Sequence, residues 1–149
     1  MRLLRKARQA LHFVGRGVLM NIYESAEDYL EAILILRERQ GSVRSIDVVH
    51  QLELTKPSVS VAMKRFRENG YIEMDGDGYI TLLPPGEEIA QRIYDRHKLL
   101  TKFLIWLGVS EDVAAADACK IEHDLSEETY SRIKEHAAKH GMNLSADLT

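Results

Sequence analysis

The sequence predicts a mainly α-helical protein whose N-terminal half is a winged helix-turn-helix with a two-stranded wing, followed by a helical C-terminal half. Three observations lead to this fold class. Apolar residues recur at helical spacing over most of the chain, one short stretch alternates with the period of a strand, and only three prolines and nine glycines interrupt 149 residues. A chain of this length forms one compact domain, or two small ones that share a core.

Three helices are expected in the N-terminal half, over residues 25–40, 46–52 and 57–69. Ser25 is a plausible N-cap for the first, with Asp28 three residues on, and Gly41 follows its end. Ser45 caps the second, and Pro57 suits the first position of the third because that position needs no N–H donor. In the third helix we expect apolar contacts from five residues, Val59, Val61, Ala62, Met63 and Phe66.

A β-hairpin is expected after the third helix. Residues 71–74 and 79–82 alternate apolar and polar side chains and flank Asp75-Gly76-Asp77-Gly78, a strong turn signal. Two helices, a turn, a further helix and a hairpin follow one another in a winged helix-turn-helix, whose third helix enters a DNA major groove. Asp75 and Asp77 at the wing tip argue against a deep contact between the wing and phosphate.

The C-terminal half is expected to be entirely helical. Pro84-Pro85-Gly86 should break the chain before a long helix over about 87–107, and further helices follow over about 111–124 and 127–140. The long helix carries an apolar stripe made of Leu99, Leu100, Phe103, Leu104 and Trp106. That stripe needs a partner surface, and core packing within one chain or a homodimer would supply one equally well.

Charge is distributed unevenly along the chain. Residues 1–20 carry five basic groups and no acidic one. The whole chain has 20 Lys+Arg and 23 Asp+Glu, so the other 129 residues carry 15 basic and 23 acidic groups, a net charge of −8. An acidic body does not bind nucleic acid through bulk charge, but residues 55–67 hold four basic side chains and no acidic one. The candidate DNA-contacting residues are Arg44, Lys56, Ser58, Ser60, Lys64, Arg65 and Arg67.

The expected domain boundaries follow from these patterns: a basic extension over 1–20, the winged helix-turn-helix over 21–83, the helical domain over 84–141 and a tail over 142–149. The apolar residues of the extension are interrupted too often for a secretory signal, by Arg8, His12 and Arg16. Two alternatives for the extension stay open: an arm that contacts DNA phosphates, or a biological start of the protein at Met20. No apolar run approaches the roughly 18 residues of a membrane span. One cysteine excludes an intrachain disulfide and fits a reducing, cytoplasmic setting.

The most specific chemical feature is the triplet Cys119, Glu122 and His123. Its spacing of i, i+3 and i+4 places all three side chains on one face of a helix. A thiolate, a carboxylate and an imidazole that converge on one patch are typical ligands of first-row transition metals.

Three further residues fit a metal site less specifically. Asp28 and Glu31 share a face of the first helix, and His97 lies near the middle of the long helix. Each has a structural explanation as well: a carboxylate at a helix start, a solvated surface residue and a core histidine, respectively.

Three blocks of the sequence resemble one known family. Glu27-Asp28-Tyr29-Leu30-Glu31, Arg96-His97-Lys98-Leu99-Leu100 and Asp117-Ala118-Cys119-Lys120-Ile121-Glu122-His123 are similar to blocks of the diphtheria-toxin-repressor family of metal-dependent regulators. The resemblance covers about residues 25–140. Because the chain stops where longer members add a C-terminal SH3-like domain, it resembles the short, two-domain manganese-transport-regulator branch.

The resemblance implies metal ligation by six residues: Asp28, Glu31, His97, Cys119, Glu122 and His123. Asp28 matches the manganese branch, where the iron branch has methionine, whereas Cys119 is similar to the iron-responsive branch and replaces a glutamate. Carboxylates favour Mn²⁺ and a thiolate favours the softer Fe²⁺, with Co²⁺ or Zn²⁺ as further first-row candidates. The expected cofactor is therefore Mn²⁺ or Fe²⁺.

The function implied is that of a cytoplasmic, metal-activated transcriptional repressor of metal-uptake genes, with no catalysis. The expected partners are double-stranded palindromic operator DNA and a second copy of the chain, joined through the C-terminal dimerisation and metal-binding domain; no membrane and no small organic substrate are expected. An ion held by both halves would fix the separation of the two recognition helices. A metal-independent winged-helix regulator and a small metallohydrolase are the alternatives.

Overall fold

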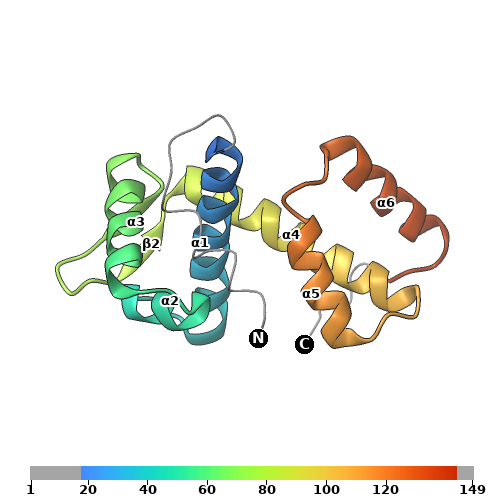
Figure 1. Cartoon of the computed structure of the whole chain (residues 1–149), viewed down its shortest axis with the longest axis horizontal. Coiled ribbons are helices and arrows are strands. Elements are labelled where there is room, and N and C mark those ends of the chain that lie inside the picture. The colour runs from blue at the N-terminus through green and yellow to red at the C-terminus, as the bar shows by residue number, and fades with distance from the viewer. Residues whose placement is uncertain (1–17, 144–149) are drawn as a thin grey trace. The chain divides into compact units, whose positions relative to one another are not determined.

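The computed structural model describes residues 18–143, and their side chains from residue 26 onward. The elements within it are α1 (Val18–Gln40), α2 (Ser45–Leu52), α3 (Lys56–Glu68), β1 (Ile72–Met74), β2 (Ile80–Leu82), α4 (Pro84–Trp106), α5 (Glu111–Ile121) and α6 (Glu127–Lys139) (Figure 1). They form two compact units, a first unit up to Arg92 and a second unit from Ile93. None of these helices is long and apolar enough to cross a membrane. The mainly helical fold class with one small sheet is confirmed.

The core of the first unit is built by α1, α2 and α3 with the hairpin against them. Leu30, Ile33 and Leu34 on α1 are at most 1% exposed, as the helical spacing of the apolar residues requires. An aromatic pair connects two of the helices, because the rings of Tyr29 and Phe66 meet edge to face with centroids 5.9 Å apart. This packing fixes the position of α3 relative to α1.

The start of α3 is set by Thr55. Its hydroxyl oxygen accepts a hydrogen bond from the backbone N–H of Ser58 at 3.3 Å, so Pro57 is the second residue of the helix and not the first. Val59, Met63 and Phe66 face the core, as predicted. The prediction that Val61 also contributes to that core was wrong, since Val61 is 45% exposed.

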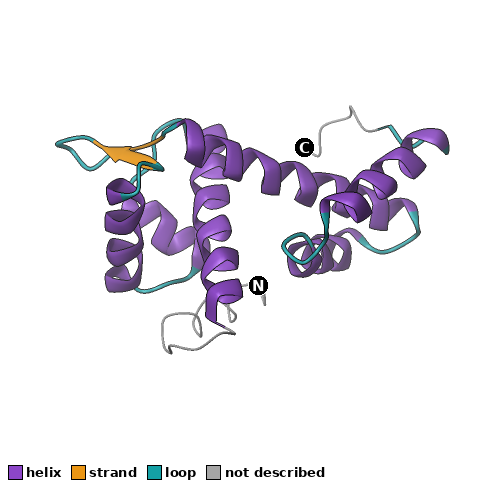
Figure 2. Ribbon diagram, turned by 90° about the horizontal axis from the view of Figure 1, so that it is seen from above, coloured by secondary structure: helices purple, strands orange, loops and turns teal. Residues whose placement is uncertain are grey.

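The wing is an antiparallel pair in which Ile72 faces Leu82, Glu73 faces Thr81 and Met74 faces Ile80 (Figure 2). Asp75 makes the tight turn, because its side-chain oxygen accepts the backbone N–H groups of Asp77 and Tyr79. The hairpin is therefore confirmed with the expected turn.

Several predicted helix boundaries were wrong. Ser45 is the first residue of α2 and not its N-cap, which is Arg44. Helix α1 begins at Val18 and not at Ser25, because no proline or glycine stands between them to stop it. Helix α4 begins at Pro84. Proline fits the first turn of a helix because backbone N–H groups there have no acceptor within the helix, so the N–H that proline lacks is not needed. Gly86 is required in that turn, since a Cβ there would collide with the backbone carbonyl oxygen of Tyr71. The predicted extension falls mostly, and the tail partly, outside the described residues.

The second unit consists of the C-terminal part of α4 together with α5 and α6. Ser126 caps α6, because its hydroxyl oxygen accepts the backbone N–H of Thr129 at 3.1 Å. Helix α5 ends at Ile121 and not at Asp124. The apolar stripe of α4 divides: Leu99 and Leu100 are buried, whereas Trp106 is 45% exposed.

Candidate metal centre and nucleic-acid interface

Three side chains of the kinds that can ligate a metal converge in the second unit. Helix α4 supplies His97, α5 supplies Cys119, and Glu122 directly follows the end of α5. The His97 Nδ1 lies 2.8 Å from Glu122 Oε2 and 3.4 Å from Cys119 Sγ. One ligand atom from each of these residues lies within 4.8 Å of the other two. The fold therefore brings these three predicted ligands together.

The position of Glu122 depends on how α5 ends. The backbone N–H of Glu122 donates to the carbonyl of Ala118 at 2.9 Å, and Glu122 keeps right-handed helical angles as the C-cap. The side chain therefore stays on the same face as Cys119 although the helix has ended. Ala114 and Ala118 are fully buried on α5, where small side chains allow a neighbouring helix to approach closely.

The carboxylate of Glu122 is 1% exposed and has imidazole groups on both sides. Its Oε1 lies 3.4 Å from Nε2 of His123, and its Oε2 faces His97. A buried carboxylate is stable only when it is hydrogen-bonded or paired with a cation. This donor set, an imidazole, a thiol and a carboxylate in one partly buried place, fits a divalent first-row transition metal.

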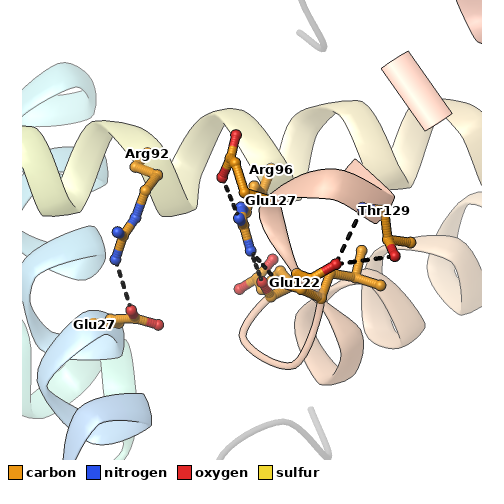
Figure 3. Close-up of polar contacts among 8 residues, drawn as sticks. Glu27, Arg92, Arg96, Glu122, Glu127 and Thr129 are labelled. Carbon is orange, nitrogen blue, oxygen red and sulfur yellow. Dashed lines mark hydrogen bonds and ion pairs between the residues drawn. The ribbon is translucent and has the colours of Figure 1, made fainter. Parts of the chain in front are cut away.

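Arg96 holds the segment that carries Glu122 (Figure 3). Its Nη1 donates to the backbone carbonyls of Glu122 at 3.2 Å and of Leu125 at 2.8 Å, and its Nη2 bonds Glu127 at 2.7 Å. The guanidinium lies 5.1 Å from the centre of the Tyr130 ring. Arg96 is only 7% exposed, and its Nε is the one buried side-chain donor without a hydrogen-bond partner within residues 26–143. It therefore fixes the loop after α5 to α4, next to His97.

The two remaining predicted ligands lie on α1, in the first unit. Glu31 is buried, at 8% exposed, and Asp28 is half-buried. Burial and the neighbouring negative charge of Asp28 raise the pKa of Tyr29 to about 12. Glu27, on the same helix, pairs with Arg92 of α4 at 2.9 Å, a contact that lies within the first unit (Figure 3). Both carboxylates belong to the first unit.

The exposed face of α3 carries the predicted DNA-contacting side chains. Lys56, Ser60, Lys64, Arg65 and Arg67 are all exposed. The Lys64 side chain is 68% exposed and has only a long, 3.9 Å ion pair with Glu68. Ser58 is half-buried and takes part in the helix cap, since Thr55 donates to its hydroxyl at 2.8 Å. Positive charge thus gathers on one helix that projects from an acidic chain.

Arg44, the remaining predicted DNA contact, lies at the base of the wing. Its backbone forms an isolated bridge with Tyr79, and its guanidinium lies 4.4 Å from the centre of the Tyr79 ring. The backbone N–H of Ile80 also donates to the carbonyl of Val43 at 2.8 Å. The strand β2 is thereby joined to the start of α2, which holds Arg44 at the side of the hairpin.

Sequence reasoning missed two residues of these sites. Arg96 stands beside His97 in the sequence, but a charged residue on a helix reads as solvated, and nothing local shows that its acceptors are carbonyls 26 and 29 residues away. Tyr79 was read only as a strand residue, and its cation–π partner Arg44 lies far away in the sequence, so no local signal connects the two.

Comparison with known protein families decides what these features belong to. Residues 21–79 match the family described as "Iron dependent repressor, N-terminal DNA binding domain". Residues 84–140 match "Iron dependent repressor, metal binding and dimerisation domain". The chain belongs to the iron dependent repressor family.

Individual relatives agree with this membership in the iron dependent repressor family. The chain is 36% identical over 118 residues to the transcriptional regulator MntR of Escherichia coli O157:H7, covering 79% of this chain and 76% of that protein. It is 37% identical over 109 residues to the HTH-type transcriptional regulator MntR of Geobacillus kaustophilus (strain HTA426), covering 73% of this chain and 77% of that one.

Solved structures show the same fold. The solved structure of a manganese-dependent transcriptional repressor in complex with manganese matches with a TM-score of 0.69 and 28% identity, over 79% of this chain and 53% of that one. The T. acidophilum IdeR structure shares the fold at a TM-score of 0.69 and 23% identity. The chain spans about half the length of these structures.

As an iron dependent repressor family member, the protein is a metal-dependent, DNA-binding transcriptional regulator and not an enzyme. The expectations of a winged helix-turn-helix, of operator DNA as a partner and of a homodimer are confirmed by the two family domains. The metal-independent regulator and the metallohydrolase are set aside on the same ground.

Proposed function

We propose that this protein senses Mn²⁺ or Fe²⁺ through a site built on His97, Cys119 and Glu122, and represses metal-uptake genes when that site is filled. The observation that carries the proposal is the convergence of these three donors, with the buried Glu122 carboxylate between two imidazoles. When bound, the divalent ion supplies positive charge to a site whose own groups are anionic or neutral. Metal affinity should therefore fall at low pH, where the thiol and the imidazoles hold their protons.

His123 and the α1 carboxylates Asp28 and Glu31 complete the proposed ligand set, as the family resemblance implies. His123 is supported by its 3.4 Å contact with Glu122. Since Asp28 and Glu31 stand in the first unit, ligation by all six residues would make metal binding and the orientation of the DNA-binding unit interdependent. Such coupling is reciprocal: operator DNA must tighten metal binding by the factor by which metal tightens DNA binding.

The side chain of Cys119 affects which divalent metal this protein prefers. A thiolate prefers softer ions such as Fe²⁺, Co²⁺ or Zn²⁺, whereas carboxylates suit Mn²⁺. One solved relative is named for its complex with manganese, and the matching family is described as iron dependent. We therefore propose that both Mn²⁺ and Fe²⁺ activate the protein, and that Cys119 favours Fe²⁺.

On the DNA side, we propose that α3 enters the major groove of each half of a palindromic operator. Lys56, Lys64, Arg65 and Arg67 would contact phosphates, with Ser58, Ser60 and Arg44 close to the duplex. The exposed Trp106 and Leu107 at the end of α4 support homodimerisation through the second unit. A DNA-binding regulator with a thiol ligand would work in the reducing cytoplasm.

The proposal is tested by fluorescence anisotropy of a labelled promoter fragment, using chelator-treated protein titrated anaerobically with Mn²⁺ and, separately, Fe²⁺. We expect DNA binding to tighten with either ion. Glu122→Gln should abolish this response while the metal-free protein stays folded and dimeric. Equal DNA affinity with and without either ion would overturn the proposal.

Matched variants locate the site. His97→Ala should lose metal activation, whereas His136→Ala, which removes an exposed histidine from α6, should keep it. Cobalt(II) provides a spectroscopic readout, because a Cys119 thiolate bound to Co²⁺ gives an ultraviolet charge-transfer band that Cys119→Ser should eliminate. A band that persists in Cys119→Ser would remove the thiolate from the ligand set.

A further inference from the structure

The face of α3 that points away from the protein has an apolar side chain at its centre. A helix turns by about 100° per residue, so the core-facing Val59, Met63 and Phe66 fall within roughly 60° of one another around the axis. On the same scale Val61 lies about 200° from Val59, diametrically opposite the core. Its exposure of 45% agrees with that position.

The neighbours of Val61 on this face are a proline and two basic residues. Pro57 and Lys64 lie one turn before and after it, and Arg65 lies one turn after it on the other side, all of them exposed. Val61 is also the sixth residue of a helix that begins at Lys56, within the N-terminal half that reaches base edges in helix-turn-helix proteins. With α3 in the major groove, this apolar residue would lie closest to the floor of the groove, beside Pro57 and the basic Lys64 and Arg65, which suit phosphate.

Base edges offer an apolar side chain one specific partner. Valine has no donor or acceptor with which to read the hydrogen-bonding pattern of a base, but the thymine C5-methyl group projects into the major groove and is recognised by apolar contact. We propose that Val61 reads a thymine methyl in each half of the operator. This assignment rests on the proposed role of α3 as the recognition helix and adds to it a preferred base.

The expected effect follows from the burial of one methyl group. Removing it is worth about a fourfold change in affinity, and about 15-fold when both halves of a palindrome lose it. The effect should depend on the base and on residue 61 together, because it belongs to the contact between them.

The test begins with selection of duplexes from a random library by the Mn²⁺-loaded dimer, followed by replacement of each thymine in the selected site by uracil, which lacks only the methyl. We expect one thymine position per half-site at which uracil weakens binding about fourfold. In Val61→Ala that difference should vanish, so that thymine and uracil duplexes bind equally. Val61→Thr, which keeps one γ-methyl group, should retain part of it.

Lys64→Ala is the matched control, since it should weaken binding to every duplex and leave the thymine-to-uracil ratio unchanged. Circular dichroism establishes that each variant is folded. A uracil scan without any sensitive position, or a sensitive position that is unaffected by Val61→Ala, overturns the assignment to Val61 alone. Failure of the dimer to select any duplex overturns the DNA-binding proposal and this inference with it.

Discussion

Replacing Arg96 by methionine should destabilise the metal-free protein by about 3 kcal/mol. The substitution keeps an unbranched apolar stem and removes the guanidinium that binds the carbonyls of Glu122 and Leu125. Each buried carbonyl left without a donor costs about 1–3 kcal/mol. The lost pair with Glu127 adds little, because that carboxylate is 71% exposed, and removal of the unpartnered Nε–H returns part of the cost.

The assay is thermal unfolding followed by circular dichroism, in chelator and at one fixed protein concentration because the protein dimerises. For a chain of this size, 3 kcal/mol corresponds to a fall in Tm of about 6–12 °C. Glu127→Gln is the matched control: it leaves the two carbonyl bonds intact and should cost less than about 1 kcal/mol.

The reasoning would be refuted if Arg96→Met unfolded at the wild-type temperature, or if Glu127→Gln were equally destabilising. The first result would mean that the carbonyls of the loop after α5 find other donors. The second would mean that the surface ion pair, and not the buried carbonyl bonds, stabilises this loop. Metal affinity gives an independent readout, since removing a residue that holds a metal ligand in position typically changes this affinity by about 10–100-fold.

Three other predictions concern the first unit. Gly86→Ala should destabilise the protein by about 1–3 kcal/mol in urea, because the new Cβ collides with the carbonyl of Tyr71, whereas Gly76→Ala at the open wing tip should be nearly neutral. Since the pKa of Tyr29 is raised in the folded state from 10.0 to about 12, its contribution to stability is complete below pH 10 and is lost as the pH rises to 12, by about 2–3 kcal/mol. Spectrophotometric titration checks this, and the late-ionising phase should be absent in Tyr29→Phe. Lys64→Ala should reduce the slope of log affinity against log salt by about 1 if Lys64 contacts phosphate, and an unchanged slope would move that contact elsewhere.

Local sequence signals were sufficient for most of the fold. Asp75 and the glycines that follow it specify the turn wherever they occur, since an aspartate side chain can accept the N–H groups of its own turn. The same is true of Thr55 and Ser126, which cap α3 and α6 through their own hydroxyl oxygens. Signals of this kind are complete within five residues, and a single sequence contains them.

The wrong boundaries have a different origin. A pair of prolines such as Pro84-Pro85 can end a helix before it or form the first turn of a helix after it. The dipeptide alone therefore does not show that Pro84 begins α4. Val61 is an apolar residue of the kind found in protein cores. Only the packing of Val59 and Met63 into the core shows that Val61, on the opposite side of the helix, faces outward. Arg96 depends on acceptors far along the chain. Non-local packing decides each of these cases.

The short bridge between residues 43–44 and 79–80 has a consequence for solubility. An open strand edge offers unpaired N–H and C=O groups to the edges of other molecules and so promotes aggregation. Here the outer edge of β2 is partly occupied by Val43 and Arg44. Strand β1 is only three residues long and carries the exposed, charged Glu73. The wing therefore offers other molecules little open strand edge on which a further strand could be added.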